Sequence, residues 1–437
     1  MPGETVLANV VRRKPRFDVA EVVAVRRESS SRVRPRCPHF GVCGGCATQH
    51  IDARAQVAFK QRALEDTLWH LGRVRPQTVL APIEGPAWGY RFRARLTVRF
   101  VAKKGGVLVG FHERGSSFVA DMTECHTLPG FVSDLLVPLR RLTERLSIRE
   151  RMPQVEVAVG EREPGCPPSA GGGRGEGPRD RPVTALVFRV LEAPSVDDLA
   201  ELCAFALAWR VEVWLQPKGP ETAWLLCDHA GTRDAPLSAL GYSLPEFGLR
   251  IPFLPTEFTQ VNFAINRQLI ARAVRLLDPL PHERVVDLFC GLGNFTLPLA
   301  TRARSVLGVE GAPGLVARAR ENARLNQAQL LGVAGEPGGV EFRSANLFDL
   351  DAAAWEAIGR VDKLLIDPPR DGALAVSQVL ASATDRPRRV VYISCNPATL
   401  ARDVGLLVNT GGWKLSYAGV INMFPHTSHV ESMAVLD

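Results

Sequence analysis

The sequence predicts an α/β protein whose C-terminal part contains a doubly wound parallel sheet. From about Thr256 onward, short apolar runs alternate with helical stretches, as in consecutive βαβ units. The predicted strands lie near residues 285–289, 306–309, 361–366 and 390–394. The first of these strands ends in a tight turn with Gly291 and Gly293, and a helical run to Ala300 follows. A strand, a glycine turn and a helix in this order build a pocket for an adenosine-containing cofactor.

The glycine turn favours S-adenosylmethionine over a dinucleotide as that cofactor. A dinucleotide fingerprint needs a third glycine, but Phe295 and Thr296 follow the turn here, which makes pyrophosphate the weaker ligand. The next predicted strand ends at Glu310, 19 residues after Gly291. An acidic residue at that distance can accept both ribose hydroxyls. Taken alone, the turn is also compatible with an ordinary strand–turn–helix that binds nothing.

Length and composition indicate a globular protein of about two to four domains, since the chain has 437 residues and a domain holds roughly 150. Its 46% hydrophobic and 23% charged residues support full-sized cores. No apolar run approaches the ~18 residues of a membrane span, and the N-terminus lacks a signal-peptide core. We therefore expect a cytoplasmic protein whose nine cysteines are ligands, nucleophiles or buried thiols rather than disulfides. The net charge of +7 suggests a polyanionic partner without identifying it.

Basic residues gather in two places. Residues 1–36 hold nine Lys or Arg against four Asp or Glu, and two runs, 5–11 and 19–25, predict strands of a small barrel. A solvated face would explain this charge, but a basic β-module ahead of an enzyme domain favours RNA binding. Residues 90–100 alternate between apolar side chains and arginines, which predicts a strand. Its arginines repel one another unless an anion meets them, so we interpret this face as RNA-facing.

Two further segments have recognisable patterns. Residues 52–71 show helical spacing, with Val57, Leu64, Leu68 and Leu71 on one side and a glycine stop after them. The stretch Gly160–Pro182 has no apolar periodicity. It reads as a flexible insertion, and Cys166 within it is incidental.

A cysteine cluster indicates a metal site. Cys37, Cys43 and Cys46 lie within ten residues, and 78 residues separate Cys46 from Cys125. Tetrahedral zinc is one reading. Iron–sulfur is the other, because cubane clusters commonly take three closely spaced cysteines and a distant fourth. A second CxxC, common at zinc sites, is absent from the sequence, and this favours iron–sulfur.

The later strands carry the residues for chemistry. One ends in Asp367-Pro-Pro-Arg370, a turn that sits beside the methyl donor in nucleic-acid methyltransferases and could also serve amino methylation. The next predicted strand ends just before Cys395. A cysteine at the carboxyl end of a parallel strand lies at the ligand crevice. A thiolate that adds to C6 of a pyrimidine makes C5 nucleophilic enough to accept a methyl group. A base must then remove the C5 proton, and the C-terminal stretch supplies three candidates: His426, His429 and Glu431.

Together these motifs resemble the RNA uracil-5-methyltransferase family over essentially the whole chain. The matching stretches are Cys37/Cys43/Cys46/Cys125, Phe258-Thr-Gln260-Val-Asn262, Asp287-Leu-Phe-Cys-Gly-Leu-Gly-Asn294, Asp367-Pro-Pro-Arg370, Ser394-Cys-Asn-Pro397 and His429-Val-Glu431. The resemblance implies a Rossmann-like class I methyltransferase domain, an iron–sulfur β-rich middle domain and an N-terminal TRAM (OB-like) β-barrel. Only the second half of the TRAM barrel precedes Cys37, which makes the module partial. The implied domains are 1–36, 37–254 and 255–437, and the helix near 52–72 is expected to pack on the last of them.

The resemblance also implies roles for individual residues. The four cysteines would hold a 4Fe-4S cluster, Cys395 would be the nucleophile, Glu431 the base, and Phe258 would pack against a flipped base. Contacts to S-adenosylmethionine would come from Gln260, Phe289, Asn294, Glu310, Asn346 and Asp367. The substrate would be a loop uridine of 23S rRNA, with no obligatory protein partner.

Several alternatives stay open at this point. The chain could modify a different 23S rRNA uridine or a tRNA uridine. It could also be an RNA-binding iron–sulfur scaffold without catalysis. An RNA cytosine-5 methyltransferase would carry a cysteine just after the acidic-Pro turn, where this chain has Arg370.

Overall fold

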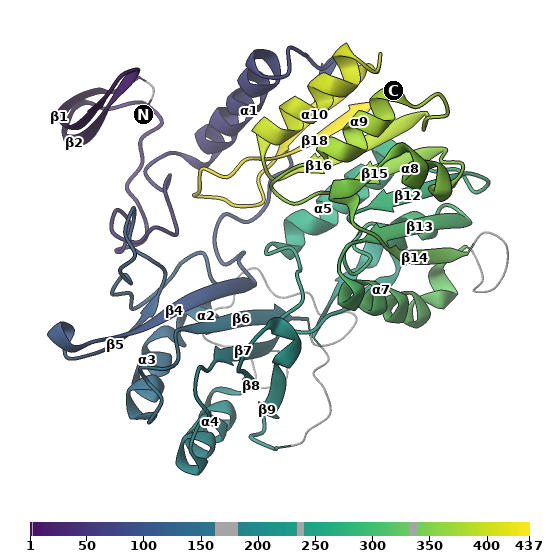
Figure 1. The fold of residues 1–437 in the computed structure, drawn as a ribbon. Coiled ribbons are helices and arrows are strands. Elements are labelled where there is room, and N and C mark those ends of the chain that lie inside the picture. The colour runs from purple at the N-terminus through teal and green to yellow at the C-terminus, as the bar shows by residue number, and fades with distance from the viewer. Residues whose placement is uncertain (2, 162–181, 234–239, 332–338) are drawn as a thin grey trace.

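The computed structural model describes residues 1, 3–161, 182–233, 240–331 and 339–437. Nearly all of the predicted insertion Gly160–Pro182, including Cys166, therefore lies outside the described residues. Within the described ranges the strands form an eight-stranded sheet, a six-stranded sheet and two separate hairpins. Figure 1 shows the two large sheets side by side. We call them the C-terminal sheet and the middle sheet.

The C-terminal sheet is the doubly wound sheet that the sequence predicts. Its order is β14-β13-β12-β15-β16-β18-β17-β3, with β14 to β16 parallel and β18 antiparallel to both neighbours. The predicted strands are confirmed, and their apolar runs are explained by burial on both faces of the sheet. The chain order reverses between β12 and β15, which creates a crevice at their carboxyl ends. The bounds are β3 (Thr78–Val79), β12 (Arg284–Leu288), β13 (Ser305–Glu310), β14 (Val340–Ser344), β15 (Lys363–Ile366), β16 (Arg389–Ser394), β17 (Leu415–Ile421) and β18 (Glu431–Leu436).

Helices cover both faces of this sheet (Figure 1). Leu269 and Leu297 belong to the core under α5, α6 and α7, whereas Leu64 and Leu400 belong to the core under α1, α8, α9 and α10. The bounds are α1 (Ala53–His70), α5 (Phe263–Leu277), α6 (Thr296–Ala300), α7 (Pro313–Leu325), α8 (Ala352–Ile358), α9 (Leu374–Ser382) and α10 (Pro397–Asn409). None of the helices in the described ranges is both long and apolar enough to cross a membrane.

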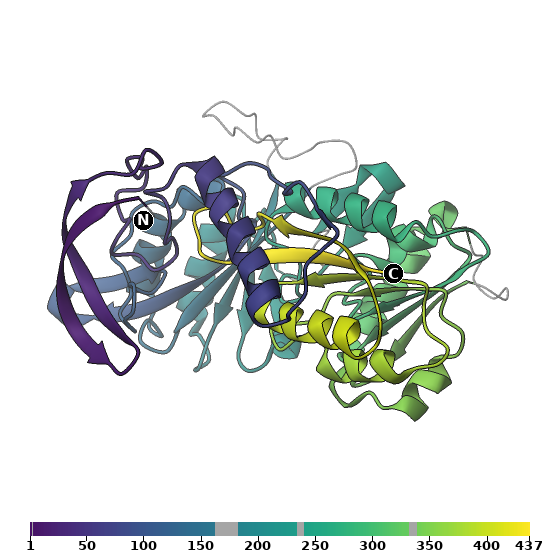
Figure 2. The same ribbon diagram turned by 90° about the horizontal axis from the view of Figure 1, so that it is seen from above.

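Helix α1 joins distant parts of the chain. Its N-cap is Asp52, whose carboxylate accepts from the backbone N–H groups of Arg54 and Ala55. The predicted helix is thus confirmed, but Leu71 is 63% exposed rather than part of the apolar side. In Figure 2 the helix runs beside α10, more than 300 residues away in the sequence.

The middle sheet has the order β5-β4-β6-β7-β8-β9. Leu136 and Phe205, from the helices α3 and α4, pack on one of its faces. Ala185, on the other face, shares a core with Leu269 of α5, so the two sheets meet through apolar side chains. The bounds are β4 (Arg93–Val101), β5 (Gly106–Gly110), β6 (Gln154–Gly160), β7 (Val183–Arg189), β8 (Glu212–Gln216), β9 (Trp224–Cys227), α2 (Gly130–Ser133), α3 (Leu136–Arg145) and α4 (Val196–Trp209). A separate hairpin follows, formed by β10 (Gly241–Leu244) and β11 (Leu249–Pro252).

The N-terminal module is a hairpin, and the expected barrel is not formed by the described residues. β1 (Thr5–Lys14) pairs with β2 (Phe17–Arg27) in a two-stranded sheet, so the two predicted strands are confirmed. Two strands cannot close on themselves, and apolar side chains such as Val11 and Phe17 remain exposed. Figure 2 shows the hairpin at one end of the molecule.

Candidate active site

The glycine turn lies at the carboxyl end of β12, where the fold places its crevice. Phe289 has φ 63° and Gly291 has φ 55°, so the chain reverses sharply after the strand. Asp287 is fully buried, and its Oδ2 accepts from Thr296 Oγ1 at 2.6 Å. Its Oδ1 has no hydrogen-bond partner among the described residues. A buried acceptor left open beside the turn fits a ligand that donates or carries positive charge.

The acidic residue predicted for the ribose lies against the same turn. Glu310 ends β13, the neighbour of β12, and its carboxylate accepts from Gly291 N at 3.0 Å and from Ala312 N at 2.9 Å. The parallel pairing of β12 and β13 therefore brings together two motifs that are 19 residues apart.

Asn294 is held by side chains that the sequence did not reveal. Its Oδ1 accepts from Tyr242 Oη at 2.6 Å and from Asn266 Nδ2 at 3.0 Å, and its Nδ2 donates to Asn266 Oδ1 at 3.1 Å. Both ends of the Asn294 amide are thus engaged with protein groups. Asn266 lies one turn beyond Asn262, the N-cap of α5, which is a signal that could have been noticed in the sequence.

Two aromatic rings border the turn. Phe289 and Phe348 make an edge-on pair with centroids 5.6 Å apart, and Phe348 was not predicted. Asn346 is exposed just before Phe348, accepts from the Phe348 N–H at 3.1 Å and donates to Asp349. These rings offer an apolar surface next to the glycine turn.

The segment that carries Phe258 and Gln260 is hydrogen-bonded to the middle sheet. Arg93 donates to the Pro255 carbonyl at 2.8 Å and contacts Thr259 Oγ1 at 3.4 Å. Phe258 is 69% exposed, while Gln260 is partly buried.

The row of arginines on β4 is only partly open, because Arg95 and Arg99 are exposed whereas Arg93 is not, and its contact with RNA stays a prediction. Arg93 turns toward the protein, and Arg95 pairs with Glu156 at 2.9 Å. Arg99 is exposed. Repulsion along the strand is relieved at Arg93 and Arg95 by protein partners.

Carboxylates concentrate around the cofactor crevice. Burial raises the pKa of Asp287 to about 8, and the nearby Asp367 and Glu310 add to this effect. Partial burial at the end of β15 raises the pKa of Asp367 to about 7. The sulfonium and ammonium groups of S-adenosylmethionine would relieve this crowding of negative charge, so the residues present fit that cofactor.

Cys395 lies at the end of β16, next to the acidic-Pro turn. Asn396 Nδ2 donates to the Arg370 carbonyl at 3.1 Å, which ties the two turns together. The Cys395 thiol is half-buried, and burial together with Glu431 and Asp367 raises its pKa, whereas Arg370 lowers it. Cys290 is buried, and burial raises its pKa well above the usual value, so it is the poorer nucleophile.

Glu431 begins β18, which pairs antiparallel with β16 so that Ser394 faces Ser432. This register brings Glu431 beside Cys395. Burial and the neighbouring Asp367 raise the pKa of Glu431 to about 8, while Lys60 and Arg370 act against this rise. A base with a pKa near the working pH is well suited to proton transfer.

The two candidate histidines have other surroundings. His426 stacks on Trp88 with ring centroids 3.8 Å apart, and burial lowers its pKa to about 4. Burial also lowers the pKa of His429, whose Nδ1 lies 3.5 Å from Arg370 Nη2. Both histidines lie in the irregular stretch before β18, whereas the pairing of β16 with β18 brings Glu431 next to Cys395.

The four predicted cysteine ligands line a common cavity: Cys37, Cys43, Cys46 and Cys125. Burial raises the pKa of Cys46 to about 11, and the other thiols add to this effect. Within the described ranges no group of three His, Cys, Asp or Glu side chains is arranged to hold a metal ion. The metal site that the cysteine spacing predicts therefore stays a prediction.

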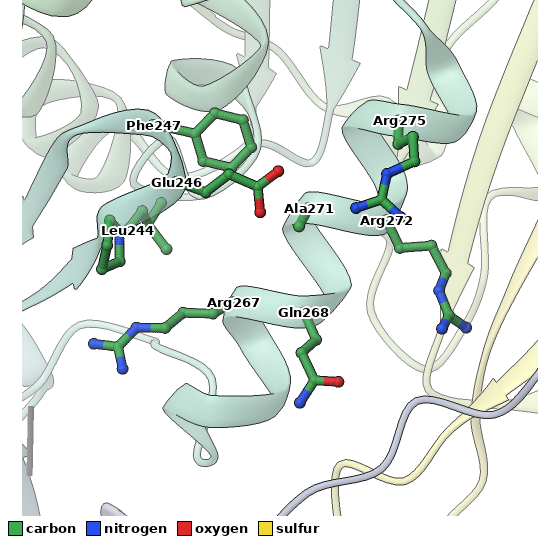
Figure 3. A pocket seen from close by; sticks show the side chains of 9 residues that line it. Leu244, Glu246, Phe247, Arg267, Gln268, Ala271, Arg272 and Arg275 are labelled. Carbon is green, nitrogen blue, oxygen red and sulfur yellow. The ribbon is translucent and has the colours of Figure 1, made fainter.

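A second hollow, of about 300 Å³, lies between β10 and α5 (Figure 3). Arg267 at its edge pairs with Glu161, and Arg272 donates to the Ala81 carbonyl. None of the residues predicted for the active site is among the described residues that line this hollow.

Doubly wound sheets of this order, with a β17–β18 hairpin after the parallel strands, are the fold of class I methyltransferases that use S-adenosylmethionine. Comparison with known proteins shows which methyltransferases this chain is similar to. Residues 249–437 match the family described as tRNA (Uracil-5-)-methyltransferase. The whole chain is 55% identical to a 23S rRNA (uracil(1939)-C(5))-methyltransferase RlmD of Cupriavidus necator, covering 92% of that protein. It is 54% identical to the protein of the same name from Bordetella avium, covering 85% of it.

A solved structure agrees in fold. The Pyrococcus abyssi tRNA (uracil-54, C5)-methyltransferase in complex with S-adenosyl-L-homocysteine superimposes with a TM-score of 0.70 at 21% identity, over 100% of this chain and 94% of that one. The chain belongs to the RNA uracil-C5-methyltransferase family.

Proposed function

We propose that the protein methylates C5 of a uridine in 23S rRNA, at the position called uracil(1939) in its relatives, with S-adenosylmethionine as the methyl donor. The observation that carries this proposal is the 55% identity to a protein of that activity over 100% of the chain. The pairing of the Cys395 strand with the Glu431 strand supports the same chemistry.

The proposed reaction runs through a covalent adduct. The Cys395 thiolate attacks C6 of the uracil, and the C5=C6 electron pair moves to C5. C5 then takes the methyl group from the sulfonium, whose C–S bond breaks to leave S-adenosylhomocysteine. Glu431 removes the C5 proton, the C5=C6 bond re-forms, and the thiolate leaves from C6. Atoms and charge balance without any further reactant.

Six residues are proposed to contact the cofactor: Gln260, Phe289, Asn294, Glu310, Asn346 and Asp367. Glu310 would take the ribose hydroxyls, since it lies at the end of the strand next to the glycine turn. Asp367 would face the sulfonium side, where it also raises the pKa of Cys395. Exposed Phe258 is proposed to pack against the flipped uracil.

The cysteine cavity is proposed to hold a 4Fe-4S cluster on Cys37, Cys43, Cys46 and Cys125. Such a cluster could supply electron transfer, but uracil methylation is redox-neutral and needs none, which supports a structural role.

The resemblance to the RNA uracil-5-methyltransferase family also underlies the proposed domains. Residues 1–36 form a partial TRAM-like RNA-binding module, 37–254 an iron–sulfur and RNA-binding domain, and 255–437 the methyltransferase. We expect the protein in the cytoplasm, acting on a loop or single-stranded uridine without an obligatory protein partner.

A methyl-transfer assay tests the proposed function. The protein is incubated with methyl-labelled S-adenosylmethionine and 23S rRNA transcribed in vitro, and the labelled nucleoside is identified after digestion. Labelled 5-methyluridine at the uridine equivalent to position 1939 is expected, and an RNA with cytidine at that position should stay unlabelled. Label in tRNA but not in 23S rRNA would refute the rRNA assignment, and labelled 5-methylcytidine would refute uracil as the target.

A further inference from the structure

The segment before Glu431 is an irregular loop that is nevertheless largely buried. Residues 422–430, here called the base loop, connect β17 to β18 without helix or strand, and residues 422, 423, 425–427 and 430 are buried. A buried irregular segment needs partners for its backbone groups. Where those partners come from determines how Glu431 is held.

Tyr90, Asn262 and Ile83 bond the Pro425 carbonyl, the Met423 carbonyl and the Asn422 N–H, and two further partners come from one side of α1. Lys60 is 5% exposed and donates to Asn422 Oδ1 at 2.8 Å and to the Phe424 carbonyl at 2.9 Å. Gln56 is 3% exposed, and its Oε1 accepts from the His426 N–H at 2.8 Å. Residues four apart lie on the same side of a helix, so both polar side chains meet the loop together. A buried amide and a buried ammonium on an otherwise amphipathic helix are unusual unless they are paired.

His426 connects this contact to the cysteine-bearing segment. Its carbonyl accepts from Ala47 N at 2.8 Å and Thr48 N at 3.0 Å, one and two residues after Cys46. Its Nδ1 lies 3.2 Å from Gln56 Nε2, and its ring stacks on Trp88. The φ of 66° at His426 is a conformation that non-glycine residues adopt only when their surroundings hold them there.

Lys60 also acts electrostatically on Glu431: its ammonium opposes the rise of the Glu431 pKa, while burial lowers the pKa of Lys60 itself to about 8. The charged and titratable groups around Glu431 come from several elements: Asp367 after β15, Arg370 in the following turn, Cys395 after β16 and Lys60 on α1. Lys60 and Arg370 both favour the Glu431 carboxylate, and Lys60 makes the shorter contacts with the base loop, to Asn422 and Phe424, whereas Arg370 lies 3.5 Å from His429.

We propose that Gln56 and Lys60 are positioning residues for the proton-abstraction step. They hold the base loop so that the Glu431 carboxylate faces Cys395, and through His426 they join the loop to the cysteine-bearing segment. This inference rests on the proposed function, because it takes Glu431 as the base. Helix α1 lies in the chain between Cys46 and Cys125. The inference gives this helix a part in the chemistry of the C-terminal sheet.

The test compares Lys60→Met with Arg62→Met. Both changes remove one positive charge from α1, but Arg62 is exposed and pairs with Asp66 on the outer side. With 23S rRNA that contains ordinary uridine, a rapid-quench experiment measures the formation of the covalent adduct and its resolution separately. Lys60→Met should form the adduct within about twofold of the wild-type rate and resolve it about tenfold or more slowly. The pH dependence of resolution should also shift to higher pH, because the ammonium that favours the Glu431 carboxylate is gone, whereas Arg62→Met should behave as wild type.

A second measurement covers the case in which Lys60→Met fails to fold. Gln56→Met should raise hydrogen exchange in residues 422–430 and at Ala47 and Thr48, with S-adenosylmethionine affinity within about twofold of wild type. Wild-type resolution with an unshifted pH profile in Lys60→Met, or unchanged exchange in Gln56→Met, would overturn this inference alone. Absence of any adduct or product in the wild-type protein would instead overturn the proposed function.

Discussion

The chemistry assigned to this protein depends on two residues that lie side by side only because β18 returns next to β16. Cys395 supplies a thiol that is half-buried, and Glu431 a carboxylate that is 7% exposed. Sequence analysis predicted both residues and Asp367 from their positions in motifs. It did not predict Tyr242 and Asn266, which engage Asn294: the position of Asn266 one turn after Asn262 was a signal, but nothing in the sequence pattern indicates that Tyr242, on a separate hairpin, reaches the same turn.

The first residue-scale prediction concerns Glu431→Gln. This change keeps the side-chain shape and removes the basic carboxylate, whereas attack at C6 and methyl transfer do not need the base. The variant should therefore accumulate a methylated covalent RNA complex that survives a denaturing gel. His429→Gln is the matched control and should turn over without accumulating it. Accumulation in the histidine variant, with normal turnover in Glu431→Gln, would show that the base is His429.

The second residue-scale prediction concerns pH and the cofactor. The pKa of Asp287 is raised to about 8 and that of Asp367 to about 7, so both are partly protonated near pH 7. A bound cation favours the carboxylates, and binding should release protons. Affinity for S-adenosylmethionine should accordingly rise as pH increases from about 6 to 8.

Calorimetry in buffers of different ionisation enthalpy measures this proton release. S-adenosylhomocysteine is the control ligand, since it lacks the sulfonium charge, and it should release fewer protons. Equal proton release by the two ligands would contradict the assignment of these carboxylates to the sulfonium.

At the scale of elements, the strands of the parallel sheet were predictable because apolar runs buried on both faces leave a clear pattern. The packing of α1 against the C-terminal sheet was harder to predict from the sequence. Gln56 and Lys60 look like surface residues of an amphipathic helix, yet their partners lie more than 360 residues away. The described residues at the N-terminus form a two-stranded hairpin and not the expected barrel. The sequence could not show this, because a pattern of two strands does not indicate whether further strands join them.

The element-scale prediction concerns β4. Arg93 fastens the segment that carries Gln260, so Arg93→Met should weaken S-adenosylmethionine binding as well as RNA binding. The loss of hydrogen bonds from a charged group costs roughly 1.5–3 kcal/mol each, and the folding free energy should fall by about that amount. Arg99→Met, from the exposed end of the same strand, should leave cofactor affinity unchanged and reduce RNA affinity alone. Unaltered cofactor affinity in Arg93→Met would show that the bonds to Pro255 and Thr259 do not matter for the site.

At the scale of the whole molecule, the cysteine segment, α1 and the C-terminal sheet form one connected body. Ala47 and Thr48 bond the base loop directly after Cys46. The spacing of the cysteines predicted a metal site, but it carried no information on which part of the enzyme that site would support. That connection depends on tertiary contacts of His426, a residue that the sequence suggested as a base.

The whole-molecule prediction concerns iron. Protein purified without oxygen should be brown and contain about four irons per chain. Cys43→Ala should lose iron and solubility together, because ligand loss uncouples metal binding from folding. Cys203→Ala, which does not alter the cysteine cavity, should keep both. One zinc and no iron in protein made with ample iron would contradict the cluster.

The central claim, a covalent methylation carried by Cys395, is tested most directly by trapping the adduct. A 23S rRNA fragment with 5-fluorouridine at the target position is incubated with the protein and S-adenosylmethionine, and the complex is digested and mapped by mass spectrometry. Fluorine cannot leave as a proton does, so the adduct should persist, with the modified uracil on Cys395 and one added methyl group. A stable adduct on Cys290, or no adduct with RNA that is methylated when it carries ordinary uridine, would contradict the account.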